Sequence, residues 1–156
     1  MTNASGRLDG TTHHFPVRVY FEDTDAFAVV YNARYLGFLE RARTEMMRLL
    51  GIPHAEMMAD HGVLFTIRRY EIDYLGPARL DDLLDVRTRV AEMGGATLAV
   101  KHEIWRGEAK LVQARVRLGC VSTAGKPARI PPVFSRRFAE WSAGSGSGDQ
   151  DQKRPD

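Results

Sequence analysis

Residues 32–51 read NARYLGFLERARTEMMRLLG and carry the clearest structural signal in the chain. Apolar side chains recur there every three or four residues, at Tyr35/Leu36, Leu39, Ala42, Met46 and Leu49/Leu50. This spacing is typical of an amphipathic helix, because the charged residues then share the opposite face. Asn32 is a favourable N-cap and Gly51 a favourable C-terminal stop. The stretch therefore predicts one long helix with a single buried face.

The segments around this helix alternate apolar and polar residues with a period of two, which indicates half-buried strands. One such segment precedes the helix at 15–22, and four follow it at 69–74, 84–90, 98–104 and 112–120. Gly94, Gly95 and Gly107 fall where hairpin turns are expected. Short helices are indicated over 54–61 and 132–141. We therefore expect an α+β fold with a five-stranded antiparallel sheet wrapped around one long central helix.

The composition limits the class of protein. The chain has 156 residues, of which 44% are hydrophobic and 27% charged, which fits one domain with a packed core. No apolar run reaches the roughly 20 residues of a membrane helix, and the polar N-terminus lacks the apolar core of a secretory signal. The single cysteine, Cys120, excludes an internal disulfide. We expect a cytoplasmic protein with one domain at 14–141, between flexible segments at 1–13 and 142–156.

The charge balance says less about function. The net charge is +2, and only 4 of the 22 basic residues are lysines. An excess of Arg suits phosphate or carboxylate ligands, but the codon bias of a GC-rich genome also produces it, and we favour that cause. No nucleic-acid-binding motif is present, so we expect no nucleic-acid partner. None of the five histidines has zinc-ligand spacing with a Cys or carboxylate, so we expect neither a metal nor another cofactor.

Three carboxylates lie within four residues, at Glu22, Asp23 and Asp25, between the first strand and the long helix. Such close like charges repel one another, so the fold must hold them there for a reason. One interpretation is that Asp favours turns and the start of helices. The other is that one carboxylate faces a cleft beside the free N–H groups of a helix N-terminus, which stabilise an oxyanion. That pair of groups suits acyl transfer, with the carboxylate as nucleophile or general base.

The sequence around these carboxylates resembles a known family. Residues 17–26 (VRVYFEDTDA), 29–36 (VVYNARYL) and 40–46 (ERARTEM) are similar to the signature of hotdog-fold acyl-CoA thioesterases. The resemblance is to the 4-hydroxybenzoyl-CoA thioesterase family and, within it, to the Tol-Pal-associated acyl-CoA thioesterase branch, which 74–82 (YLGPARLDD) also resembles. It covers about 16–135. It implies a hotdog fold, hydrolysis of an acyl-CoA to free acid and CoA, and sites shared between subunits of a homodimer or homotetramer.

The resemblance also implies roles for single residues. Asp25 falls on the catalytic carboxylate, and both catalytic roles require that group in its ionised form. The N–H group that polarises the thioester carbonyl lies near Tyr31. Asn32 stands where the branch usually has His and cannot exchange a proton near pH 7. We expect Asn32 to cap the helix, and contact with the substrate is the alternative. Phe27 and Ala28 replace the usual Gly-Gly, so the acyl preference of the family does not carry over.

The CoA phosphates raise a further question. In the family a basic cluster holds them near the hairpin before the fourth strand, where this chain has Gly94 and Gly95. Their backbone N–H groups are weak candidates for phosphate contact, and Arg79, Arg106 or Arg129 are alternative cations.

Two further residues have simpler interpretations. Glu40 occupies a helix position where some other hotdog thioesterases carry a catalytic carboxylate, and we expect it to pair with Thr44 or Arg43. Cys120 lies on the apolar phase of its strand and is expected to be buried and inert.

Two other functions stay open. One is a non-hydrolytic acyl-CoA-binding protein, which the replacement of the usual His by Asn32 favours. The other is a hydratase or dehydratase of acyl thioesters, which would need a catalytic His. No His is adjacent to the Asp-Thr-Asp turn in the sequence.

Overall fold

A computed structural model describes residues 3–144 of the chain, so most of the predicted C-terminal tail, 145–156, lies outside the described residues. In chain order the elements are β1 (Arg7–Asp9), β2 (Thr12–Arg18), the 3-10 turn η1 (Phe21–Asp23), α1 (Arg34–Leu49), α2 (His54–His61), β3 (Val63–Tyr74), β4 (Leu83–Met93), β5 (Thr97–Arg106), β6 (Ala109–Ser122) and α3 (Pro132–Ser142). Within 3–144, no helix is long and apolar enough to cross a membrane.

All the strands form one antiparallel sheet in the order β1-β2-β4-β5-β6-β3. The predicted α+β class is confirmed, but the sheet has six strands rather than five. The additional strand is β1, which lies in the segment 1–13 that we expected to be flexible. All three β1 residues are exposed, so the strand has no buried face and leaves no period-two pattern in the sequence.

The boundaries of two strands also differ from the prediction. β2 ends at Arg18, and the chain turns into η1 although the alternation continues to Glu22. The alternation is misleading there, because Phe21 is 82% exposed rather than part of the core. β3 begins at Val63, six residues before the predicted start.

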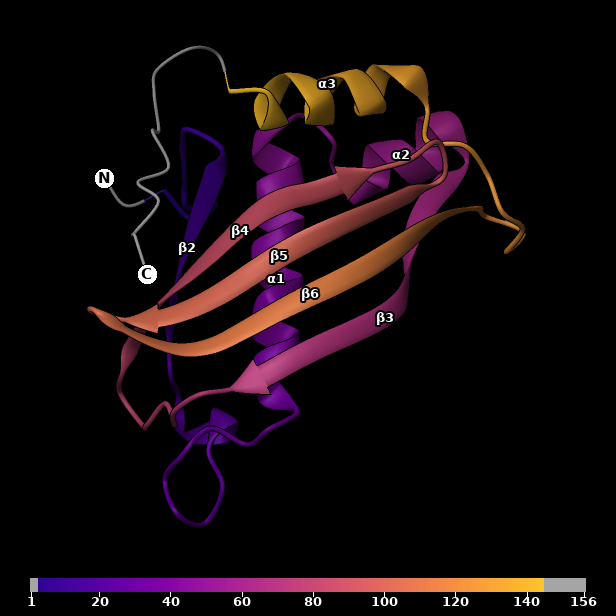
Figure 1. The fold of residues 1–156 in the computed structure, drawn as a ribbon. Coiled ribbons are helices and arrows are strands. Elements are labelled where there is room, and N and C mark those ends of the chain that lie inside the picture. The colour runs from indigo at the N-terminus through magenta and orange to yellow at the C-terminus, as the bar shows by residue number, and fades with distance from the viewer. Residues whose placement is uncertain (1–2, 145–156) are drawn as a thin grey trace, which may run out of the picture.

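The sheet curves across one side of α1, and α3 lies across one end of it (Figure 1). Seven α1 residues are buried: Tyr35, Phe38, Leu39, Ala42, Arg43, Met46 and Met47. The apolar core has two parts. One surrounds the first half of α1, and the other surrounds its second half and includes Phe134 and Phe138 of α3.

A polar layer separates the two apolar clusters. Arg43 of α1 lies 3.2 Å (Nη1) from Nε2 of His102, and Nδ1 of that histidine lies 2.9 Å from Oγ1 of Thr88. Arg43 Nη2 also donates to the hydroxyl of Tyr70 at 3.3 Å. Burial, reinforced by the charge of Arg43, holds the pKa of His102 well below its ordinary value. The ring is therefore neutral, and it accepts a hydrogen bond from Arg43 and donates one to Thr88.

Candidate active site

A tight loop of residues 25–29, the Asp25 loop, lies at the end of the molecule where α1 begins (Figure 1). The N–H of Asp25 donates to the carbonyl of Val29 at 3.0 Å, and the N–H of Ala28 donates to the carbonyl of Asp25 at 3.0 Å. The N–H groups of Val30 and Leu80 then join this loop to the connection between β3 and β4. These backbone hydrogen bonds hold Asp25 in place on both sides.

The three carboxylates of this region have different surroundings. Asp23 is buried, and its Oδ2 accepts from the N–H of Tyr20 at 2.9 Å while its Oδ1 lies 3.4 Å from Nε of Arg34. Glu22 and Asp25 are exposed. Oδ1 of Asp25 accepts from the N–H of Phe27 at 2.8 Å, and no described residue hydrogen-bonds to its other oxygen. Asp23 therefore stabilises the turn, whereas Glu22 and Asp25 both keep carboxylate oxygens without a partner in residues 3–144. Of these two, only Asp25 is held by a backbone N–H group.

The start of α1 differs from the expectation. The N-cap is Ala33, and no side chain caps the helix, so the prediction that Asn32 caps it is wrong. The chain already turns at Tyr31, whose carbonyl accepts from the N–H of Arg34 at 2.8 Å, so the helix begins one residue too late for Asn32 to cap it. The carbonyl of Asn32 instead accepts from the hydroxyl of Tyr74 at 3.1 Å.

Among the described residues, two backbone N–H groups are free near Tyr31, where the polarising N–H was expected, but that of Tyr31 is not one of them. The N–H of Tyr31 donates to the carbonyl of Asp23 at 3.0 Å and is therefore occupied. The N–H groups of Asn32 and Ala33 make no hydrogen bond to any residue of 3–144. Unpaired N–H groups at the N-terminus of a 16-residue helix carry its positive dipole end, so they are suited to an oxyanion.

Between Asp25 and the helix, the departure from the family pattern has a conformational cost. Ala28 has a φ of 58°, which is the left-handed region that glycine adopts freely and alanine does not. The usual Gly-Gly of the family therefore suits the backbone of this loop. In this chain an alanine holds the same conformation under strain.

Large apolar side chains surround the loop and face solvent. Phe27 is 83% exposed, Tyr31 58%, Tyr74 49% and Leu75 54%. Tyr74 is tied to the start of α1 through its hydroxyl, so these side chains belong to one end of the molecule. Clustered exposed apolar groups mark a surface that binds an apolar ligand or another protein chain.

The weak candidates for CoA binding do not come together in one chain. Arg79 forms an isolated bridge with Val29 and so lies beside the Asp25 loop. Gly94 and Gly95 form the turn at the other end of β4, which lies beside α3 (Figure 1). Arg129 lines a cavity of about 260 Å³ at that turn.

Two other predicted residues are resolved by the structure. Glu40 is exposed, and in the described chain it makes neither a hydrogen bond nor an ion pair with Thr44 or Arg43. The expected pair is wrong because Arg43 is buried and reaches His102 instead. Cys120 is buried as predicted, and burial raises the pKa of its thiol.

The polar layer around Arg43 was not predicted, although the sequence contains its signal. Thr88 and His102 both lie on the inward-facing phase of their strands, and the register pairs them directly. A His and a Thr at facing inward positions require a polar partner in the core.

An antiparallel sheet curved around one central helix defines a hotdog-type protein. The chain belongs to the thioesterase-like superfamily, whose pattern its residues 19–138 match. It is 45% identical over 125 residues to the acyl-CoA thioesterase YbgC of Haemophilus influenzae, which covers 80% of this chain and 92% of that protein. It is 39% identical over 135 residues to the acyl-CoA thioester hydrolase YbgC of Escherichia coli O6:H1, which covers 85% and 100%.

A solved structure agrees with these relatives. The probable thioesterase from Bartonella henselae superposes with a TM-score of 0.74 at 38% identity, over 77% of this chain and 99% of that one. The predicted resemblance to the acyl-CoA thioesterases is therefore confirmed.

Proposed function

We propose that this protein hydrolyses the thioester bond of an acyl-CoA, giving a free acid and CoA, and that Asp25 is its catalytic carboxylate. One observation carries the proposal: the N–H of Phe27 holds one carboxylate oxygen of Asp25 and leaves the other without a partner in residues 3–144, at the end of the molecule where α1 begins with free N–H groups. The YbgC relatives, which are named as thioesterases that act on acyl-CoA, support the choice of substrate.

The N–H groups of Asn32 and Ala33 are the donors that we assign to the thioester carbonyl oxygen. They would stabilise the negative charge that develops on that oxygen when the carbonyl carbon is attacked. Asp25 either attacks that carbon directly, which expels the CoA thiolate and leaves an anhydride for water to cleave, or removes a proton from an attacking water. The N–H of Phe27 orients the carboxylate in both routes.

The first test removes the charge of Asp25. Asp25→Asn should fold normally, because the side chain is exposed, and should lose about 100-fold or more of kcat/KM in a thiol-release assay with acyl-CoA. Glu22→Gln is the matched control, since it removes an exposed carboxylate from the same region, and it should keep nearly full activity. Near-normal turnover by Asp25→Asn would remove Asp25 from the mechanism.

A second measurement separates the two routes. Single-turnover hydrolysis in oxygen-18 water places label in the Asp25 carboxylate only if that group is the nucleophile. Label that enters the acid product alone supports the general-base route.

The replacement of the usual His by Asn32 favours one alternative, a protein that binds acyl-CoA without hydrolysing it. Tight binding of acyl-CoA without release of thiol would support that function. A hydratase or dehydratase has less support, since no His occurs between residues 15 and 53.

The working unit that we propose is a homodimer or homotetramer. Gly94 and Gly95 follow the end of β4, whereas the Asp25 loop lies near the start of that strand. A CoA that touched both places would therefore need a second copy of the chain. β3 is a strand of 12 residues at the edge of the sheet, where its outer hydrogen-bonding groups are available to a second copy. Apolar side chains exposed around Tyr31 also favour such an interface.

A further inference from the structure

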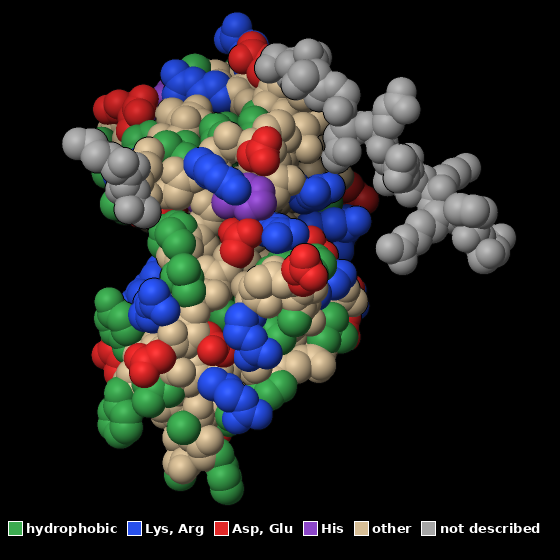
Figure 2. All heavy atoms as spheres, turned by 90° about the vertical axis from the view of Figure 1, so that its left-hand side faces the viewer, with side chains coloured by type: hydrophobic (Ala, Val, Ile, Leu, Met, Phe, Trp, Pro, Cys, Tyr) green, Lys and Arg blue, Asp and Glu red, His purple; other side chains and the backbone are tan. Residues whose placement is uncertain are grey.

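A second cavity, of about 600 Å³, opens on the face of the sheet that points away from α1. It lies between the N-terminal segment, the strands β2, β4 and β5, and the turn after β5. Its lining includes Arg7, His14, Asp85, Arg87 and Trp105. On the side of the molecule that carries β2, Figure 2 shows a histidine side chain with basic and acidic side chains around it. The volume lies in the range of small-molecule sites.

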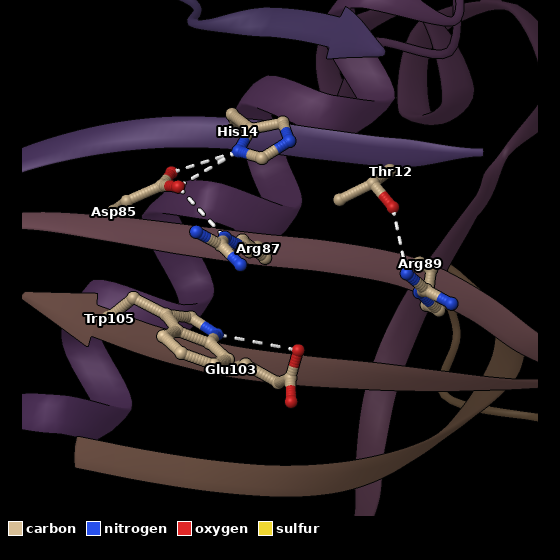
Figure 3. A network of polar contacts seen from close by, with 7 residues as sticks. All are labelled: Thr12, His14, Asp85, Arg87, Arg89, Glu103 and Trp105. Carbon is tan, nitrogen blue, oxygen red and sulfur yellow. Dashed lines mark hydrogen bonds and ion pairs between the residues drawn. The ribbon is translucent and has the colours of Figure 1, made fainter. Parts of the chain in front are cut away.

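Three neighbouring strands bring the polar groups of this cavity together. His14 on β2 pairs with Arg87 on β4, and Asp85 on β4 pairs with Trp105 on β5. Nδ1 of His14 lies 2.9 Å from Oδ2 of Asp85, and Nε of Arg87 donates to the same oxygen at 2.9 Å. The Arg87 guanidinium lies over the Trp105 ring, with its carbon 4.5 Å from the ring centroid (Figure 3).

These contacts leave a specific set of groups unused. The Asp85 carboxylate is occupied by two donors, so its negative charge is offset within the cluster. The two terminal nitrogens of Arg87 make no hydrogen bond to a residue of 3–144, and the second ring nitrogen of His14 points away from Asp85 (Figure 3). Arg7 adds another cation to the lining. The cavity therefore offers the Arg87 guanidinium over the Trp105 ring as a stacking surface. It also offers the terminal nitrogens of Arg87 as hydrogen-bond donors to an oxyanion.

We propose that this cavity binds a purine nucleotide. The base would stack on the Trp105–Arg87 pair, and the phosphate would accept hydrogen bonds from the free nitrogens of Arg87 and from Arg7. A simple aryl carboxylate shares the ring and the charge but fills much less of the volume. Two ligands contain this group: a free nucleotide, and a CoA thioester with its nucleotide end in the cavity. Binding of the nucleotide does not depend on the proposed hydrolysis.

The test is isothermal titration of the full chain with 5′-AMP. We expect saturable binding, and about tenfold weaker binding by Arg87→Ala, which removes both the stacking surface and the phosphate donor. Arg89→Ala is the matched control, because Arg89 lies two residues along the same strand, donates to Thr12 and does not line this cavity. Its affinity should stay within about twofold of that of the unaltered chain. Trp105→Leu should weaken binding in the same direction as Arg87→Ala.

Two further titrations decide the chemistry. Adenosine, which lacks the phosphate, should bind more weakly than 5′-AMP by about tenfold. No saturable binding of 5′-AMP, equal binding of adenosine, or equal loss in Arg87→Ala and Arg89→Ala would overturn the proposal. Binding of benzoate in preference to 5′-AMP would overturn it as well.

Steady-state hydrolysis then identifies the source of the nucleotide. If the ligand is the nucleotide end of CoA, Arg87→Ala should raise KM for acyl-CoA and leave kcat unchanged. If the ligand is a free nucleotide, the same variant should lose 5′-AMP binding with KM and kcat unchanged. A chain that binds 5′-AMP but does not hydrolyse acyl-CoA would contradict the proposed function and leave this site standing.

Discussion

Ala28 holds a backbone conformation that alanine adopts at a cost, three residues from the candidate catalytic carboxylate. Its φ of 58° is fixed by the loop, because its N–H donates to the carbonyl of Asp25 and its carbonyl accepts from Leu80. The left-handed region costs an L-residue roughly 1–2 kcal/mol. The hydrogen bonds of the loop therefore maintain a strain that glycine would relieve.

Ala28→Gly should stabilise the protein by about 1 kcal/mol in urea unfolding, since the relief of strain exceeds the greater entropy of glycine in the unfolded chain. Ala26→Gly is the control in the same loop. Ala26 does not have a positive φ, so glycine there should lower the free energy of unfolding. Equal effects of the two substitutions would show that Ala28 is not strained in solution.

Phe27 presents its ring to solvent while its backbone serves the site. The ring is 83% exposed, and the N–H donates to Asp25, so Phe27→Gly removes the ring and keeps the hydrogen bond. If the ring lines the acyl site, the variant should change the ratio of kcat/KM between long-chain and short-chain acyl-CoA by about tenfold in favour of the longer chain. An unchanged ratio would place the ring outside the acyl site.

At the scale of elements, α1 and the sheet are joined by the polar layer of Arg43, His102 and Thr88. His13 of β2 is also fully buried, and its Nε2 lies 2.7 Å from the carbonyl of Ser5. Burial lowers the pKa of both histidines below the ordinary value of 6.5. The folded protein therefore requires two neutral imidazoles inside the sheet.

This requirement predicts how stability depends on pH. Because the folded state binds these protons more weakly than the unfolded state, the unfolded chain takes up protons first as the pH falls below about 6.5. The free energy of unfolding should be fully present above pH 6.5 and fall below it, by up to about 1.4 kcal/mol per pH unit for each histidine. Urea unfolding at pH 7.5, 6.5 and 5.5 measures this slope.

Two variants test whether the buried His102 ring causes this dependence of the free energy of unfolding on pH. His102→Gln should reduce the loss of stability between pH 6.5 and 5.5, whatever its effect at pH 7.5. His61→Gln, at an exposed position of α2, should leave the slope unchanged. Burial also lowers the pKa of His54, so a slope that survives in His102→Gln would have to come from His13, from His54 or from carboxylates.

The elements that the sequence predicts well are those whose burial follows a regular period. α1 and the cores of β4, β5 and β6 bury every second or every third to fourth residue, so their patterns are visible. β1 has no buried face, and the start of α1 is set by hydrogen bonds between Tyr31, Asp23 and Arg34 rather than by a capping side chain. The residue pattern by itself does not distinguish Asp23 from Asp25, because contacts across the loop decide which carboxylate is buried, and only the family resemblance indicates Asp25.

At the scale of the whole molecule, the long strand β3 forms one edge of the sheet, and its outer side pairs with no other described strand. Arg69 and Glu71 project from β3 with 69% and 55% of their side chains exposed, and within one chain they form an ion pair with 2.9 Å between Nη2 and Oε1. A second copy of β3 that pairs antiparallel about a twofold axis at Tyr70 would place Arg69 of one strand opposite Glu71 of the other, twice. Opposite charges at facing positions stabilise a strand pair, and like charges destabilise it.

This pattern predicts a charge-reversal experiment on the proposed homodimer. Arg69→Glu and Glu71→Arg should each weaken dimerisation by about tenfold in sedimentation equilibrium, because each creates two facing pairs of like charge. The double variant restores two pairs of opposite charge, so its dissociation constant should return to that of the unaltered chain. The loss should be smaller at high salt, since these groups are exposed and screened. Single variants that dimerise normally, or a double variant that stays as weak as either single one, would mean that the chains associate through another surface.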